Sequence, residues 1–457
     1  MLALRSFRLV ANASLPSRIG GNLLAQPETG LVRTIGRWSL VALMLNSIIG
    51  SGIFGLPSLL AARLGGYSPL SCLIAGSGAL IVAACIAEVS SRFVATGGLY
   101  LYGRAALGRF PGLLIAWLTW LMRITAPAAV VNLFANYLGQ FLPFVHGKLW
   151  ELTVLAVLIG HLAFLNYIGV RTGKTVSNIF TVMKVGSLVV FIGAGLIAAM
   201  FHPELRLALQ FGATTARGWF DALLLLVFGY GGFEGAAAVG GEASDPKRDM
   251  PFALLTALTA LCFLYTGVVY VVLTTLPNAG ESVRPMADAA GHFLGGWGAT
   301  AIGCAALVST YGNLSANLLH GPRLTFALAE QGDFPKPFAK IHAKFRTPHV
   351  SIVVYAALVF AFAAVGNFQW NAVLSAVARL VVYVGMAVAL LVLRKRQGAA
   401  PFALPAGIAF SGATLLIALV LLSQMGRGDA IVLVVTAIVA FTNWFVVRRR
   451  RADQLGG

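Results

Sequence analysis

The sequence predicts an all-α polytopic membrane protein, because its composition is strongly apolar and its apolar residues fall in long stretches. Of 457 residues, 58% are hydrophobic and 11% are charged, and the mean hydropathy is +0.85. Soluble domains carry about 25% charged residues, and a membrane-spanning helix needs about 20 mainly apolar residues. We expect twelve spans with no soluble domain between them. They are 38–62, 68–91, 112–142, 150–168, 176–200, 219–240, 252–276, 297–320, 349–366, 370–393, 403–424 and 429–447.

The net charge of +18 follows this topology and does not indicate a nucleic-acid partner. With a cytoplasmic N-terminus and alternating sides, the cytoplasmic segments hold 24 Lys and Arg, and the outer loops hold six. Such an excess in cytoplasmic loops is typical of polytopic membrane proteins. We therefore expect a multi-pass protein in the bilayer of the cell inner (plasma) membrane, with both termini cytoplasmic.

Two of the spans are interrupted by glycines at matching positions. The first span contains IIGSGIFG (48–55), and the sixth contains FGYGGFEG (228–235). Glycine costs about 1 kcal/mol relative to alanine inside a helix. Each cluster lies about twelve residues into its span, which is roughly 18 Å along a helix and near the membrane midplane. Five spans separate the two copies, so the copies would be inverted, and matching interruptions indicate a transporter's binding site.

Broken helices at the midplane have a defined chemistry. Lipid cannot satisfy the exposed backbone groups, so these groups must face a cavity or a ligand. The helix that starts after a break attracts a carboxylate, and the carbonyls that end the helix before it attract a cation. An amino acid is the simplest zwitterion that fits both ends. The alternative is that the glycines only let helices pack closely, but two clusters at equivalent positions favour broken helices.

Four motifs carry a resemblance to a known family: IIGSGIFGLP (48–57), GGLYLYGRAALG (97–108), GGFEGAAAVGGEASDPKRDMP (231–251) and PRLTFALAEQGDFP (322–335). Over roughly residues 36–400 the chain resembles the amino acid–polyamine–organocation (APC) transporter superfamily. The resemblance implies a leucine-transporter-like fold with 5+5 inverted repeats, spans 1 and 6 broken and two extra spans. The implied parts are an N-terminal cytoplasmic tail (1–35), two repeats (36–200 and 201–396), spans 11 and 12 (397–447) and a C-terminal cytoplasmic tail (448–457).

The resemblance also implies a substrate site built largely of backbone. The residues it implies are Ile48, Ser51, Gly52, Ile53, Phe228 and Gly231. The amides of residues 51–53 would hold the substrate carboxylate, and the carbonyls of the other three would hold its amino group. Phe228 also stands where many members of the family have an aromatic side chain over the substrate. Tyr230 is expected either in the wall of this site or facing lipid.

Lys184, inside span 5, is the expected coupling residue. Charged side chains within the membrane are costly and mark function by default. In the family, a lysine here projects toward span 1, where sodium-coupled relatives bind sodium, so its ammonium would replace that cation. Burial disfavours the charged form of a lysine, so a proton could also be exchanged at this position. The alternative is a lysine that extends toward the lipid headgroups.

Three further charges inside the spans are expected to have structural or pathway roles. Glu88 in span 2 is expected to pair with a nearby basic or backbone group. Glu234 directly follows the span 6 break and is expected to bond unwound backbone or line the pathway. Arg379 in span 10 is expected to pair with one of these acids, with direct substrate contact as the alternative. The role of Arg123 in span 3 stays open.

The sequence contains no pattern that indicates an enzyme. No nucleophile–base pair or paired carboxylates lie at one depth, and the Cys and His residues lack metal-ligand spacing, so we expect no catalytic residues, cofactor or metal. The expected function is sodium-independent secondary transport of an amino acid by alternating access, with proton coupling left open. Apolar residues and glycines around Phe228 favour a neutral substrate. An exchanger, an amine uniporter and a transceptor that binds substrate without moving it are the alternatives.

Overall fold

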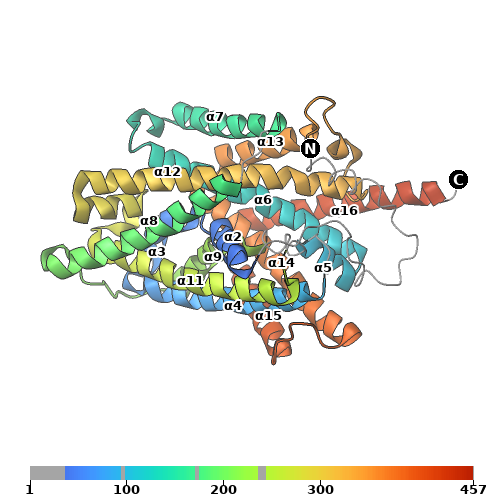
Figure 1. The fold of residues 1–457 in the computed structure, drawn as a ribbon, viewed down its shortest axis with the longest axis horizontal. Coiled ribbons are helices and arrows are strands. Elements are labelled where there is room, and N and C mark those ends of the chain that lie inside the picture. The colour runs from blue at the N-terminus through green and yellow to red at the C-terminus, as the bar shows by residue number, and fades with distance from the viewer. Residues whose placement is uncertain (1–35, 94–97, 170–173, 235–242, 456–457) are drawn as a thin grey trace.

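The computed structural model describes residues 36–93, 98–169, 174–234 and 243–455, which form an all-helical multi-span bundle (Figure 1). The α-helices are α2 (Arg37–Ile48), α3 (Gly52–Leu64), α4 (Ser68–Ser91), α5 (Gly98–Leu107), α6 (Arg109–Leu138), α7 (Lys148–Tyr167), α8 (Lys174–Phe201), α9 (Ala216–Gly229), α11 (Pro246–Thr275), α12 (Pro285–Glu330), α13 (His349–Val365), α14 (Phe368–Gln397), α15 (Gly407–Leu422) and α16 (Arg427–Leu455). Short 3₁₀ turns are Gly65–Tyr67, Pro143–His146, Pro203–Leu205, Ala279–Glu281 and Lys336–Ala339.

Within this part of the chain, eight helical segments are long and apolar enough to cross a membrane, and the apolar helices α13 and α15 are shorter. The long helices run roughly along one direction, with α7 at one edge of the bundle and α15 at the opposite edge (Figure 1). Large apolar side chains on the outer helices are exposed, among them Val157, Phe164, Val190 and Ile431. Apolar surface on this scale fits contact with lipid.

The first span is divided into two helices, as predicted. Helix α2 ends at Ile48, and α3 begins at Gly52 after a non-helical turn. In the sixth span, α9 ends at Gly229, and helical conformation returns at Phe233. Residue 235 and the remainder of the predicted span 6 lie outside the described residues. Both interruptions therefore fall where the glycine clusters predict them.

The broken helices lie inside the bundle because long continuous helices surround them. Helix α4 packs along α11, α14 packs along α6, and α12 also packs against α6. The halves α3 and α9 pack on each other, and α14 contacts α9. In Figure 1, α2, α9 and α14 lie near the middle of the bundle.

Several helix ends are fixed by the residues that the sequence places there. Asp245 caps α11 by accepting from the Lys247 amide at 3.2 Å, and Pro246 follows at the first position of the helix. Asn367 caps α14 by accepting from the Trp370 amide at 2.9 Å. Side-chain caps of this kind satisfy amides that have no partner within the helix.

The structure extends two of the predicted elements and adds a helix between two others. Helix α12 runs from Pro285 to Glu330, with a kink at Gly295 (φ 73°), so it continues well past the predicted end of span 8 at residue 320. Residues 98–107, expected in a loop, form the helix α5. Helix α16 continues to Leu455, so much of the predicted C-terminal tail is helical. The predicted N-terminal tail (1–35) lies outside the described residues.

Candidate substrate-binding site

The two breaks touch each other at the centre of the bundle. The Ser47 hydroxyl donates to the Gly232 carbonyl at 2.8 Å. Gly232 has a φ of +119°, and a Cβ added there would lie 2.7 Å from the Ser47 carbonyl oxygen. A Cβ added at Gly52 would lie 3.0 Å from the Gly229 Cα. Only glycine combines this backbone conformation with so close an approach, so the glycines join the two interrupted spans.

The first turn of α3 presents backbone amides that have no hydrogen-bond acceptor in the described part of the protein. No described residue accepts a hydrogen bond from the amides of Ser51, Gly52 or Ile53, although all three residues are buried. The Ser51 hydroxyl is also buried without a hydrogen-bond partner. Buried backbone donors are nearly always paired in proteins. Together with the positive end of the helix, these donors form a site suited to a carboxylate.

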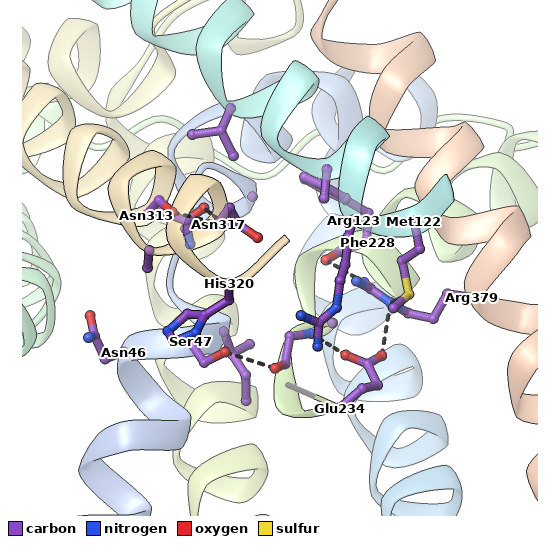
Figure 2. Close-up of a pocket in the computed structure, with 18 of the residues that line it drawn as sticks. Asn46, Ser47, Met122, Arg123, Phe228, Glu234, Asn313, Asn317, His320 and Arg379 are labelled. Atoms are coloured by element: carbon purple, nitrogen blue, oxygen red, sulfur yellow. Dashed lines mark hydrogen bonds and ion pairs between the residues drawn. The ribbon is translucent and has the colours of Figure 1, made fainter. Parts of the chain in front are cut away.

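A cavity of about 520 Å³ lies against this helix end. Its lining comes from α2, α3, α5, α6, α8, α9, the turn after α9, α12 and α14. Of the six residues predicted to bind substrate, Ile48, Ser51, Gly52, Phe228 and Gly231 line the cavity, and Ile53 does not. Figure 2 shows side chains from α2, α6, α12 and α14 converging on this space.

The carbonyl end of α9 is already occupied by a cation from α14. The Arg379 guanidinium donates from Nη1 to the Val227 and Phe228 carbonyls at 3.2 and 3.4 Å. The Phe228 carbonyl also accepts from the Gly231 amide at 3.1 Å. The amino-group contact predicted at Phe228 is therefore taken by an arginine. By contrast, no described residue donates to the Ile48 carbonyl at the end of α2.

Glu234 holds this arginine in place. Its carboxylate forms an ion pair with Arg379 Nε at 2.9 Å, and it accepts hydrogen bonds from the Gly232 amide at 2.8 Å and from the Tyr383 hydroxyl. Arg379 and Glu234 are both buried, and dashed lines in Figure 2 mark their pairing. The cluster joins α14 to the unwound turn of the sixth span. Within it, Arg379 and Glu234 form the ion pair that the sequence predicted for Arg379.

The two aromatic residues of the break have different surroundings. Phe228 lines the cavity, and its ring packs edge-on against Phe368 with centroids 6.1 Å apart. Tyr230 neither lines the cavity nor faces lipid. It is buried, stacks on Tyr265 at 5.2 Å, and its hydroxyl donates to the Cys72 carbonyl at 2.9 Å. Both expectations for Tyr230 are therefore wrong, because the close packing of α9 against α4 encloses it.

Lys184 on α8 is buried and reaches the first span. Its Nζ donates to the Asn46 carbonyl at 3.2 Å, near the end of α2. The side chain also lines the cavity. A lysine extended toward the headgroups would be exposed, so the structure does not support that alternative.

Glu88 lies away from the cavity and is fully engaged. Its carboxylate accepts from Arg394 at 2.5 and 2.7 Å, from Arg92 at 3.2 Å and from the Leu404 amide at 2.9 Å. It is 1% exposed. The acid therefore joins α4 to α14 and to the segment before α15, which is a structural role.

Two of the motifs recognised in the sequence meet at Asp333. This buried carboxylate accepts from Tyr100, from Arg104 at 3.0 Å and from Arg109 at 2.8 Å. Burial, aided by the charge of Asp333, raises the pKa of Tyr100 to about 12, so the phenol stays protonated and donates. Because Tyr100 also lines the cavity, the cluster connects the site to the end of α12.

Sequence reasoning left Arg123 without a role and missed other polar residues of the cavity. Arg123 on α6 and Asn313, Asn317, His320 and Arg323 on α12 all line it. Arg323 follows the predicted end of span 8 at residue 320, and it lies in the cavity because α12 continues past that residue. The sequence did contain a signal for the residues of α12. Residues spaced by four and three lie on one face of a helix, and Asn313, Asn317 and His320 have this spacing.

The bundle, its two broken helices and the cavity between them are the arrangement typical of a membrane transporter. Among the described residues, no cluster of His, Cys, Asp or Glu could hold a metal ion. The amino acid permease family model matches residues 35–447. The chain therefore belongs to the amino acid permease family of the APC superfamily, which is a family of transporters and not of enzymes.

Individual relatives are similar along most of their length. The chain is 25% identical to the branched-chain amino acid permease of Bacillus subtilis, over 93% of this chain and 95% of that protein. It is 28% identical to the serine/threonine exchanger of Bacillus subtilis, over 81% and 85%. It is 26% identical to the methylthioribose transporter of the same organism, over 82% and 84%. The chain thus functions in amino acid transport across a membrane.

Proposed function

We propose that this protein is a sodium-independent amino acid transporter that works by alternating access around α2–α3 and the broken sixth span. The observation that carries the proposal is the set of buried, unpartnered amides of Ser51, Gly52 and Ile53 beside the cavity. These donors would hold the substrate carboxylate, and the open Ile48 carbonyl would accept from its amino group. The family membership supports a leucine-transporter-like arrangement of 5+5 inverted repeats and two extra spans.

Lys184 supports sodium independence. Its ammonium, donated to the Asn46 carbonyl, supplies a tethered positive charge beside the break in span 1, so no sodium ion is required there. We also propose proton coupling through this lysine. The excess of Lys and Arg in the predicted cytoplasmic segments supports a plasma-membrane protein with both termini cytoplasmic. The similarity to a serine/threonine exchanger favours exchange as the second mode of transport.

We expect uptake into proteoliposomes to be unchanged when sodium is replaced by choline. Lys184→Met keeps a stem of similar length but removes the tethered charge, so uptake should fall at least about tenfold, since a hydrogen bond to a charged group contributes about 1.5–3 kcal/mol. Lys174→Met, at the first residue of the same helix, is the matched control and should transport normally.

Sodium-dependent uptake would contradict the proposal, and so would wild-type rates in the Lys184→Met variant. Counterflow separates the two modes of transport: an exchanger needs amino acid inside the vesicle, whereas a proton-coupled carrier responds to an imposed pH gradient without it.

A further inference from the structure

The lining of the cavity is strongly basic. Among the described lining residues the cationic side chains are Arg123, Lys184, Arg323 and Arg379, and the acidic side chain is Glu234. Glu234 is committed to Arg379, Tyr383 and the Gly232 amide. A cavity with this excess of positive charge is complementary to a ligand that carries more than one negative group.

The carbonyl end of α9 already has a cation, and a second cation lies near the end of α2. Lys184 donates near the end of α2, and Arg379 donates at the end of α9. Apart from the open Ile48 carbonyl, the groups that remain for a ligand are mainly hydrogen-bond donors, namely the three amides at the start of α3. The balance of donors and acceptors therefore favours carboxylates over amines.

Arg123 is the basic side chain best placed for a second carboxylate. Within the described residues its guanidinium forms no hydrogen bond and no ion pair, whereas Arg379 does both. Arg123 is half-buried, and Figure 2 shows it reaching from α6 into the space between His320 and Glu234. The Tyr355 hydroxyl donates to its carbonyl and fixes this turn of α6. A guanidinium in such a position is suited to a two-point bond with a carboxylate.

We propose that the substrate is an amino acid with an acidic side chain, whose second carboxylate binds Arg123. This inference rests on the proposed function: the α-carboxylate lies on the amides of α3, and the side-chain carboxylate lies across the cavity. The sequence alone favoured a neutral substrate because the residues around Phe228 are apolar. Helix packing brings Arg123 and Arg323 into the same cavity, and this is why we propose an acidic substrate instead.

The test compares each acid with its amide, since the two differ little in size. Thermal unfolding of the purified protein is measured against L-glutamate, L-glutamine, L-aspartate and L-asparagine. A ligand that binds only the folded state raises the unfolding temperature according to its affinity. One acid should bind at least about tenfold more tightly than its amide, as a hydrogen bond to a charged group contributes about 1.5–3 kcal/mol.

Three variants locate the effect. Arg123→Gln should remove the preference for the acid, and Arg123→Lys should keep part of it. Arg206→Gln removes a positive charge from an exposed loop and should leave the preference unchanged. If Arg123→Gln does not fold, the comparison of acids with amides in the wild type and the Arg123→Lys variant still test whether an acidic side chain binds Arg123.

Two results would overturn the inference while leaving the proposed function intact. One is tighter binding of the amides, or of an apolar amino acid, than of the acids. The other is an unchanged acid preference in Arg123→Gln. If no amino acid binds or is transported, the proposed function is overturned together with this inference.

Discussion

Gly232→Ala is expected to abolish substrate binding and transport while the protein still reaches the membrane. The φ of +119° is unfavourable for alanine, and the added Cβ would lie 2.7 Å from the Ser47 carbonyl oxygen. The turn after α9 would have to move away from α2, and the hydrogen bond from Ser47 to the Gly232 carbonyl would be lost. Uptake per unit of protein in the membrane is the measurement.

A glycine with open surroundings provides the control for this substitution. Among the described residues, a Cβ added at Gly193 on α8 meets no atom within 4 Å beyond the nearby backbone of its own helix, so Gly193→Ala should transport at the wild-type rate. Normal transport by Gly232→Ala would show that the two breaks need not touch for substrate to bind.

Arg379→Met is expected to destabilise the protein strongly, because it leaves the Glu234 carboxylate buried without its cation. Breaking a buried ion pair by removing one partner costs about 3–5 kcal/mol. Both side chains are almost fully buried, 5% and 3% exposed, so water would compensate little. The thermal unfolding midpoint in detergent should fall clearly below that of the wild type.

The double variant Arg379→Met with Glu234→Gln separates loss of the pair from an unpaired charge. It removes both charges, so it should be more stable than Arg379→Met alone. If the double variant is no more stable than the single variant, the ion pair is not what holds α14 against the sixth span.

The position of the breaks could be predicted from the sequence because their signal is local. Glycines near Gly50 and Gly231 weaken a helix at a depth where lipid requires a regular one. The predicted direction of Lys184 toward the first span depended on family resemblance, and the bond to the Asn46 carbonyl has that direction.

The composition of the cavity could not be predicted, because it depends on how the helices are rotated and where they end. Arg123 lies in an apolar span whose inward face no periodic pattern identifies, and only its packing against α12 and α14 places it in the cavity. Arg323 follows the predicted end of span 8, and the actual length of α12 converts a loop residue into a lining residue. Tyr230 was misplaced for a related reason, since the contact of α9 with α4 is long-range.

The central claim is that the start of α3 binds the carboxylate of an amino acid, and competition by a decarboxylated analogue tests it most directly. Proteoliposomes take up the labelled amino acid that stabilises the protein most, with an excess either of the same unlabelled amino acid or of the amine formed by removing its α-carboxylate. We predict that the unlabelled amino acid abolishes labelled uptake and that the amine leaves it nearly unchanged, because the amine has no group for the amides of Ser51, Gly52 and Ile53. Equal competition by the amine would contradict the account.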